Sequence, residues 1–312
     1  MILPEKATKP TMYFIGVSTS KSSIMKIFPA WAKALGLGDA VLKGIDMEIH
    51  SPADEYREVV KLIRDDPFSQ GALITTHKID LYNACEDMFD YLDPYAVTFG
   101  ELSSISKEGN NLLGHAKDPI SSGLAMDEFI PENHWIGNDK YACILGAGGS
   151  ALAIAAYLCH EKWGDNIPRR INFVNRSAPR LAESVKRLAH LRVPLSFHLC
   201  PSVDLNDRIV RNMPDGSMVV NATGLGKDRP GSPLTDDCVF PKNALVWEIN
   251  YRGSLEFMHQ AIGQQKDRNL IIEDGWSYFI YGWTAVIAEV FHTGISKEGL
   301  QKCRELADEY RK

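Results

Sequence analysis

The sequence predicts an α/β protein with two layered units, each built around a largely parallel sheet. Three observations support this. The chain has 312 residues, more than a single hydrophobic core usually serves. Its first third alternates short apolar runs with helical patterns. Further on, an apolar run at 141–145 leads directly into a glycine-rich turn and an alanine-rich helix.

In the first third, the apolar runs predict strands over 12–17, 45–50 and 72–75. The segments between them predict helices over 23–37, 53–65 and 78–89. Two extended pieces follow, over 98–105 and 112–116, joined by a turn at 107–111. They indicate a hairpin at the edge of the sheet.

The strongest motif is the strand, glycine turn and helix over 141–151. Gly146 permits the tight turn, Gly148 lets the backbone approach a pyrophosphate, and Ala151 keeps the helix close to the sheet. A phosphate would bind the free N–H groups at the helix N-terminus. A second apolar strand at 171–175 completes the βαβ unit, and further strands are expected near 195, 218 and 244. This pattern predicts a Rossmann unit that binds a dinucleotide.

The end of the second strand favours NADP over NAD as the cofactor. The carboxylate that would bind the ribose hydroxyls of NAD is absent, and Asn175, Arg176 and Ser177 stand there, with Arg180 one turn later. A guanidinium pairs with a 2′-phosphate through charge-assisted hydrogen bonds. The alternative is that both arginines only solvate the start of a helix.

A polar, turn-rich stretch at 131–139 marks the expected boundary before this unit. After Tyr251 the pattern becomes helical, with an apolar segment over 276–291 and a charged helix from 296 onward. These helices have too little sheet of their own, so we expect them to pack on the first domain. The predicted domains are therefore an α/β substrate-binding domain (1–135), a Rossmann domain (136–274) and returning C-terminal helices (275–312).

Composition narrows the range of partners. The chain is 45% hydrophobic and 24% charged and has a net charge of −6. This charge does not favour binding to nucleic acid or to an anionic membrane. Its six cysteines form no C-x-x-C pair, which fits a reducing cytoplasm. No signal pattern opens the sequence, and no apolar stretch approaches the roughly 18 residues of a membrane span. We expect a cytoplasmic protein with a small-molecule substrate; a homodimer stays open.

Polar clusters follow the predicted strands of the first domain, where open α/β sheets bind ligands. The hydroxyl run from Ser18 to Ser23 can wrap a carboxylate, or it can supply Ser22 or Ser23 as a helix cap. Lys78 stands at a helix start, where the positive end of the dipole disfavours an ammonium. A role in proton transfer would explain it. His77 beside it is interpreted as a bystander.

Asp118 precedes a proline and is either a helix cap or a carboxylate that orients Lys78. The nine histidines show neither H-x-x-x-H nor H-E-x-x-H spacing, so no metal site is expected. No G-x-S-x-G occurs, so a nucleophile elbow is not predicted either.

Taken together and in this order, these clusters resemble the shikimate/quinate dehydrogenase family over nearly the whole chain. Ser20-Lys21-Ser22 is similar to the family's S-x-S carboxylate clamp. The run from Gly71 to Lys78 resembles G-x-N-V-T-x-P-x-K, one residue short, and Gly114 to Asp118 resembles G-x-N-T-D. The resemblance makes Lys78 and Asp118 the counterparts of the catalytic lysine and its partner aspartate.

The remaining site residues follow from the same resemblance. Residues 146–149 match G-A-G-G, 175–177 match N-R-T/S, 221–226 match N-A-T-x-x-G, Tyr251 matches Y-x-P-x-x-T, and Gly275 opens the closing segment. The implied substrate-binding residues are Ser20, Ser22, Thr75, Ser103, Tyr251 and Gly282. The implied cofactor-binding residues are Gly146, Ala147, Gly148, Gly149, Ser150, Asn175, Arg176, Ser177, Arg180, Asn221, Ala222, Thr223 and Gly275.

Departures from the family pattern fall mainly on the substrate side. Leu73 replaces an asparagine, Gly282 replaces a glutamine, and two Asn-Thr pairs become Ser103-Ser104 and Ala116-Lys117. The resemblance therefore implies an NADP-dependent oxidoreductase that moves a hydride between NADP(H) and a ring hydroxyl or ketone of a cyclic hydroxy acid other than shikimate. The alternative is a catalytically idle regulator of the same fold that binds NADP or a metabolite.

Overall fold

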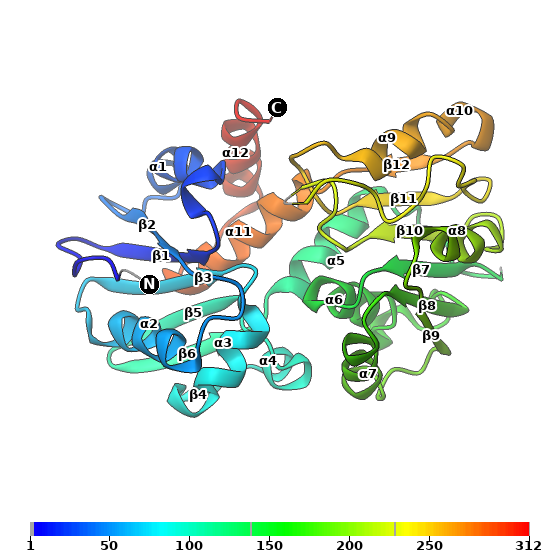
Figure 1. The fold of residues 1–312 in the computed structure, drawn as a ribbon. Helices are drawn as coiled ribbons and strands as arrows, with labels where there is room; N and C mark the ends of the chain where they lie inside the picture. The colour runs from blue at the N-terminus through cyan, green and yellow to red at the C-terminus, as the bar shows by residue number, and fades with distance from the viewer. Residues whose placement is uncertain (1–2, 138, 228, 312) are drawn as a thin grey trace. The chain divides into compact units, whose positions relative to one another are not determined.

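The computed structural model describes residues 3–137, 139–227 and 229–311 (Figure 1). The chain divides into two compact units. Unit 1 consists of Met1–Lys117 and Gly282–Lys312, and unit 2 of Asp118–Tyr281. These limits differ from the predicted domain limits because helix α5 (Asp118–Phe129) packs closely on α6 (Gly149–Leu158) of unit 2. At their contact, a Cβ added to Gly123 would lie 2.1 Å from the ring of Tyr157.

Unit 1 contains a six-stranded sheet in the order β2-β1-β3-β5-β6-β4. Its strands are β1 (Thr11–Gly16), β2 (Val41–Asp46), β3 (Ser69–Ile74), β4 (Tyr91–Leu92), β5 (Ser104–Glu108) and β6 (Asn111–His115). Strand β1 pairs in parallel with β2 and β3, whereas β5 is antiparallel to both β3 and β6. The helical segments between them are η1 (Thr19–Lys21), α1 (Ile24–Ala34), α2 (Ala53–Asp65), α3 (Lys78–Cys85), η2 (Glu86–Met88) and α4 (Pro94–Phe99).

Three local expectations for this sheet are wrong. The second strand covers Val41–Asp46 and not 45–50, because the chain turns after it and His50 takes a φ of 61°. The hairpin β5–β6 is not at the sheet edge, because the short β4 pairs with β6 beyond it. The start of the predicted 98–105 strand is the end of α4, a helix that Asp93 begins by accepting a hydrogen bond from Ala96 N at 2.6 Å.

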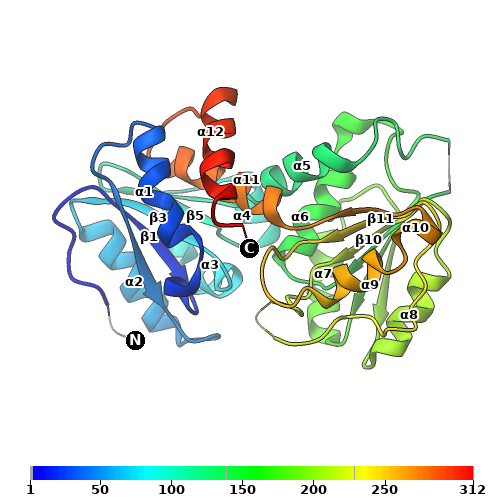
Figure 2. The same ribbon diagram turned by 90° about the horizontal axis from the view of Figure 1, so that it is seen from above.

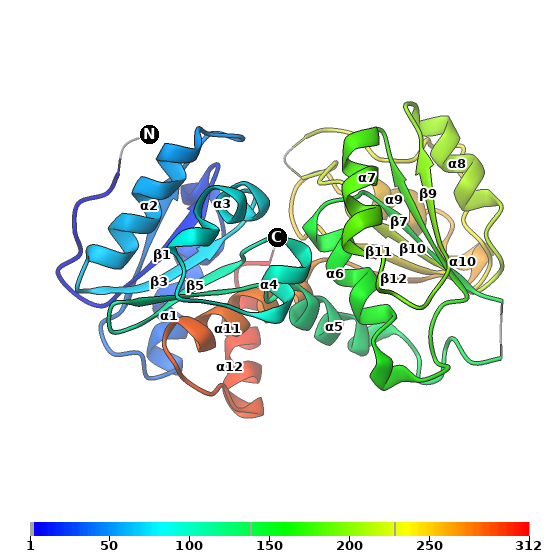
Figure 3. The ribbon, with the colours of Figure 1, turned by 90° about the horizontal axis from the view of Figure 1, so that it is seen from below.

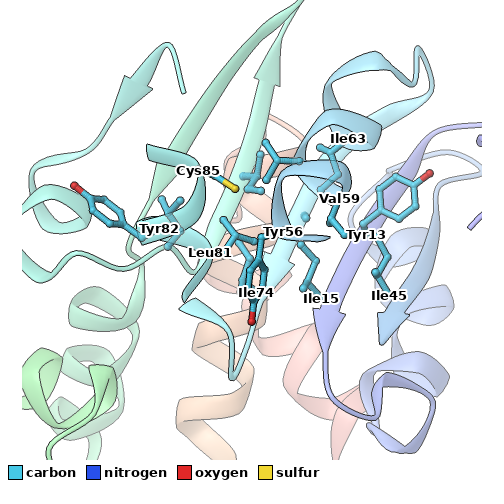
Figure 4. Close-up of a cluster of buried hydrophobic side chains, with 14 of the residues drawn as sticks. Tyr13, Ile15, Ile45, Tyr56, Val59, Ile63, Ile74, Leu81, Tyr82 and Cys85 are labelled. Carbon is cyan, nitrogen blue, oxygen red and sulfur yellow. The ribbon is translucent and has the colours of Figure 1, made fainter. Parts of the chain in front are cut away.

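The core of unit 1 lies between the sheet and helices α2 and α3 (Figure 4). Tyr56, Val59 and Ile63 of α2 lie on one helix face, and each is at most 1% exposed. They pack against Tyr13 and Ile15 of β1. This buried face fixes the strands whose carboxyl ends carry the polar clusters.

The C-terminal helices α11 (Trp276–Val290) and α12 (Lys297–Asp308) return to the first part of the chain, as the sequence predicts. Helices α1 and α12 lie side by side (Figure 2). The Trp31 indole N–H donates to the carbonyl oxygen of Cys303 at 2.8 Å, and the rings of Phe14 and Trp283 meet edge to face at 4.9 Å. From Gly282 onward these helices are part of unit 1.

Unit 2 contains a fully parallel sheet in the order β12-β11-β10-β7-β8-β9, whose strands run side by side in Figure 3. Its strands are β7 (Tyr141–Leu145), β8 (Arg170–Asn175), β9 (Leu195–Leu199), β10 (Met218–Asn221), β11 (Leu245–Glu248) and β12 (Ile271–Glu273). Its other helical segments are η3 (Glu161–Trp163), α7 (Ala178–Arg187), α8 (Val203–Arg211), α9 (Glu256–Ile262) and α10 (Gln265–Arg268). The α/β fold class with a Rossmann unit is confirmed. Among the described strands of unit 2, the three-residue β12 is the one that the sequence pattern does not predict.

Candidate active site

The hydroxyl run after β1 forms the short helix η1 and the turn into α1. Asp46 at the end of β2 holds this turn, since its Oδ1 accepts hydrogen bonds from the backbone N and hydroxyl of Thr19 at 2.8 and 2.5 Å. Thr19 is buried, Ser20 is exposed and Ser22 is half-buried. Ser23 occupies the cap position of α1 but makes no side-chain capping bond. The expected capping role is therefore not filled.

Lys78 is the first residue of α3, directly after β3. Its backbone N donates to the carbonyl of Thr75 at 3.1 Å, and the Thr75 hydroxyl donates to Ile15 O at 3.2 Å. His77 is fully buried and its Nδ1 lies 2.9 Å from the Tyr56 hydroxyl. Burial lowers the pKa of His77, which keeps its ring neutral next to Lys78.

Ser103 is buried directly before β5, and its backbone N donates to the carbonyl of His115 at the end of β6. Its hydroxyl accepts a hydrogen bond from Lys117 N at 2.7 Å and donates to His115 O at 3.4 Å. The hydroxyl therefore braces the backbone around residues 115–117. Its substrate-binding role stays a prediction.

Lys117 forms an ion pair that the sequence does not reveal. Its Nζ lies 2.5 Å from Glu289 Oε2 on α11, and His115 Nε2 lies 3.4 Å from the other oxygen of the same carboxylate. Burial alone would raise the pKa of Glu289, but the hydrogen bond from Lys117 and the nearby positive charges outweigh burial and hold it below its usual value. Gly282 lies seven residues earlier on the same helix, two turns from this charge pair.

In unit 2, Asp118 is the first residue of α5 and is 6% exposed. Its Oδ2 accepts a hydrogen bond from the Tyr278 hydroxyl at 3.1 Å, and the same hydroxyl lies 3.4 Å from Ser150 Oγ. Tyr278 thus connects Asp118 to the segment that follows the glycine turn. Sequence reasoning missed this tyrosine because nothing in its neighbourhood distinguishes it from core aromatic residues.

Tyr251, predicted to bind substrate, lies in unit 2 after β11. Its ring packs against those of Phe279 and Trp276, with centroids 4.4 and 5.6 Å away. Gly275 contacts the same segment closely, since a Cβ there would lie 2.0 Å from Ile249 O. The structure brings Tyr251 and Gly275 into one local cluster.

The glycine turn has the conformation that the sequence predicts. Gly146 has a φ of 130°, and an added Cβ would lie 2.5 Å from Ala222 O. Gly148 has an extended backbone at the N-terminus of α6, with no atom within 4 Å of an added Cβ and no side-chain cap. This helix start has no side-chain cap, and the N–H groups in the first turn of a helix favour an anion.

The segment after β8 forms a tight turn into α7. Asn175 Oδ1 accepts a hydrogen bond from Ser177 N at 2.9 Å, and Ser177 Oγ caps the helix by accepting from Arg180 N at 3.5 Å. Arg176 and Arg180 are both exposed. Two exposed guanidinium groups thus lie at one turn, whose side-chain oxygens already accept hydrogen bonds from its own backbone.

The segment after β10 is held by a buried carboxylate that sequence reasoning missed. Glu248 at the end of β11 is fully buried and accepts hydrogen bonds from the side chains of Asn221 and Asn250, each at 2.6 Å. Burial raises the pKa of Glu248 to about 7, against hydrogen bonds that lower it. Asn221 Oδ1 in turn accepts from the backbone N and hydroxyl of Thr223 at 3.1 and 2.7 Å.

Two negative findings concern only the residues that the structure describes. Among them, no group of three or more His, Cys, Asp or Glu side chains could hold a metal ion. Nor does any helix in those ranges combine the length and apolar character needed to cross a bilayer.

These features define a two-unit α/β protein with a Rossmann unit, and comparison with known proteins gives the family that it resembles. No family model matches the chain. It is 30% identical to shikimate dehydrogenase (NADP⁺) of Streptococcus gordonii over 167 residues, which are 52% of this chain and 53% of that protein. The corresponding enzyme of Lactococcus lactis subsp. cremoris is 26% identical over 214 residues, covering 67% of this chain and 68% of the relative.

Solved structures show the same fold over the whole length. Quinate dehydrogenase from Corynebacterium glutamicum in complex with NAD superposes with a TM-score of 0.71 at 18% identity, covering 96% of this chain and 99% of that one. The first sequence alignment spans only about half of the curated relative. The resemblance to the shikimate/quinate dehydrogenase family that the sequence predicts is confirmed.

Proposed function

We propose that this protein is an NADP-dependent alcohol dehydrogenase of the shikimate/quinate dehydrogenase type. It would catalyse reversible hydride transfer between NADP(H) and a ring hydroxyl or ketone of a cyclic hydroxy acid. The observation that carries the proposal is a Rossmann unit with an open glycine turn in the same chain as a lysine at the head of α3. Relatives named shikimate dehydrogenase (NADP⁺) support both the reaction and the cofactor.

The residues of unit 2 fit the proposed cofactor. The free N–H groups of α6 and the open space at Gly148 suit a pyrophosphate. The exposed Arg176 and Arg180 suit a 2′-phosphate, because a guanidinium pairs with phosphate through charge-assisted hydrogen bonds. The segment Asn221-Ala222-Thr223 would lie along the nicotinamide. When bound, the nicotinamide accepts or supplies the hydride.

The residues of this chain would handle the proton. In the oxidation direction Lys78, as a neutral amine, takes the proton of the substrate hydroxyl while the hydride leaves the same carbon, which gives a ketone. In reduction, the Lys78 ammonium returns that proton to the alkoxide oxygen. Asp118 would stabilise the ammonium form, and Ser20, Ser22 and Tyr251 would hold the substrate.

The substrate proposed is a cyclic hydroxy acid other than shikimate. Leu73 and Ala116 are buried apolar residues, the Ser103 hydroxyl is engaged by the backbone of Lys117 and His115, and Gly282 has no side chain. Hydroxyls that amide side chains would bind have fewer partners here, and each lost buried hydrogen bond costs about 1 kcal/mol. We expect Gly282→Gln to shift the ratio of kcat/KM values for shikimate and quinate toward shikimate. An unchanged ratio would show that this position does not select the substrate.

The decisive experiment measures the change in NADPH absorbance with a panel of cyclic hydroxy acids. Lys78→Met should lower kcat by about a hundredfold or more, with the Kd for NADP unchanged. Lys61→Met, an exposed lysine on α2, is the matched control and should keep full activity. Tight NADP binding without turnover for any acid would instead support the idle regulator.

The division of labour between the parts of the chain belongs to the same proposal. Residues 1–135 would bind the substrate and 136–274 the cofactor, with 275–312 packed on the first domain. Each part can be tested separately with its own ligand. Calorimetric titration of the full chain with NADP alone tests the cofactor part.

A further inference from the structure

Glu248 is a buried carboxylate of unit 2 that accepts hydrogen bonds from two asparagines, Asn221 and Asn250. It ends β11, directly opposite Asn221 of β10 in the parallel register. Its Oε2 accepts from Asn221 Nδ2 at 2.6 Å, and its Oε1 accepts from the backbone N and side-chain Nδ2 of Asn250 at 2.9 and 2.6 Å. In the part of the chain that the structure describes, these three N–H donors face the two oxygens, an arrangement suited to the ionised form.

The two asparagines connect Glu248 to residues 222–226 through hydrogen bonds. Their Nδ2 groups both donate to the carbonyl of Leu225, at 3.3 Å from Asn221 and 3.2 Å from Asn250. Asn221 Oδ1 accepts from the backbone N and hydroxyl of Thr223, and the Thr223 hydroxyl accepts from Leu225 N at 3.1 Å. The orientation of each amide is therefore fixed on one side by Glu248 and on the other by the loop.

This loop lies against the glycine turn. Ala222 N donates to Leu145 O at 2.8 Å, and a Cβ on Gly146 would lie 2.5 Å from Ala222 O. A shift of the loop backbone would therefore change the turn that leads into α6. The proposed cofactor site shares these two segments.

Protonation of Glu248 would disturb this arrangement. A carboxylic O–H needs an acceptor, and the nearest side chains present only N–H donors. Rotating the amide of Asn221 to offer its oxygen would turn an N–H toward Thr223 N, and rotating that of Asn250 would remove a donor from Leu225 O. Either change breaks a contact that holds the loop.

The charged groups around Glu248 favour its ionised form only weakly. Lys227, in the segment after the loop, lowers its pKa, whereas burial raises the pKa to about 7. On β12, Glu273 pairs in register with Trp247 and so points to the other face of the sheet. The Asp274 carboxylate accepts from Trp276 N at 2.8 Å. The carboxyl thus changes its charge within the ordinary range of cellular pH.

We propose that Glu248 is a positioning residue whose carboxylate fixes the amides of Asn221 and Asn250, and through them the backbone of 222–226, so that cofactor affinity follows its ionisation. The link to cofactor affinity rests on the proposed function. The link to the loop does not, because it concerns contacts within the chain alone.

Hydrogen exchange of the full chain without cofactor tests the loop. Between about pH 8 and about pH 6, the protection of the 221–226 amides, corrected for intrinsic exchange, should fall about tenfold in the wild type. Glu248→Gln should show low protection at both pH values. Asp207→Asn is the matched control, because Asp207 is a buried carboxylate of unit 2 that accepts hydrogen bonds from Thr235 and not from this loop.

Calorimetric titration with NADP tests the second link. The ratio of the Kd values of Glu248→Gln and wild type should be about ten at the higher pH and approach one at the lower. Titration of the cofactor phosphate cancels in this ratio. Absence of NADP binding in the wild type would refute the proposed function and leave the exchange result to decide the role of Glu248.

The positioning role is refuted if wild-type protection does not depend on pH, or if Asp207→Asn loosens the loop as much as Glu248→Gln does. If Glu248→Gln does not fold, the wild-type pH series decides alone. A loop that responds to pH while the ratio of Kd values stays at one would overturn the link to cofactor affinity.

Discussion

The glycine turn of unit 2 allows a paired test, because its two glycines have opposite surroundings. An alanine at Gly148 would have a compatible φ of −98° and no atom within 4 Å of its Cβ. An alanine at Gly146 would need a φ of 130° and would place its Cβ 2.5 Å from Ala222 O. Gly148→Ala should therefore affect the binding of the ligand, and Gly146→Ala the stability of the fold.

For Gly148→Ala we expect the unfolding free energy of the cofactor-free protein to stay the same or rise by up to about 1 kcal/mol, because alanine restricts the unfolded chain. The added methyl group would occupy the space at the N-terminus of α6 that a pyrophosphate needs. NADP affinity should fall at least about tenfold, which corresponds to about 1.4 kcal/mol.

For Gly146→Ala we expect the unfolding free energy to fall by about 2–4 kcal/mol, from the strained φ and the displaced backbone of residue 222. Denaturant unfolding without cofactor and calorimetric titration with NADP measure the two effects separately. Wild-type NADP affinity in Gly148→Ala would refute the placement of the pyrophosphate, and wild-type stability in Gly146→Ala would refute the steric argument.

Three further predictions concern charge and packing. Arg176→Ala should weaken NADP at least about tenfold while barely changing the Kd for NAD, since only the 2′-phosphate needs a guanidinium; equal losses in calorimetry would contradict this. Trp31→Phe should lower the unfolding free energy by about 1–3 kcal/mol because Cys303 O loses its indole donor, and unchanged denaturant unfolding would speak against that contact. The pKa of Glu248 is raised from its usual 4.5 to about 7, so between these values the folded chain binds more protons than the unfolded chain and the unfolding free energy falls as pH rises. The fall is at most about 3 kcal/mol, and the same slope in Glu248→Gln would contradict it.

The arrangement of strands and helices could largely be predicted from local sequence. The parallel sheet of unit 2 follows from apolar runs separated by helical patterns, and the turn at Gly146 follows from its spacing to the strand before it. The sequence does not locate the end of an element where a helix cap competes with an apolar run. Thr98 and Phe99 are residue types that favour a strand, yet Asp93 and Pro94 start a helix that includes them.

Some residues of the candidate site could be predicted from local sequence, and others could not. Lys78, Asp118 and Arg176 stand in local patterns that a single segment reveals, so the sequence alone points to them. Glu248 and Tyr278 have no such pattern, because their importance comes from partners 27 and 160 residues away in the chain.

The sequence by itself therefore determined the fold class, the dinucleotide turn and the identity of the proton-transfer candidates, since each depends on spacing within one strand–turn–helix segment. Only the tertiary structure decided which polar side chains are buried, such as Glu248, and which are paired, such as Lys117 with Glu289. The physical reason is that desolvation and ion pairing depend on what surrounds a group in three dimensions, and contacts between distant segments leave no periodic signal in the chain.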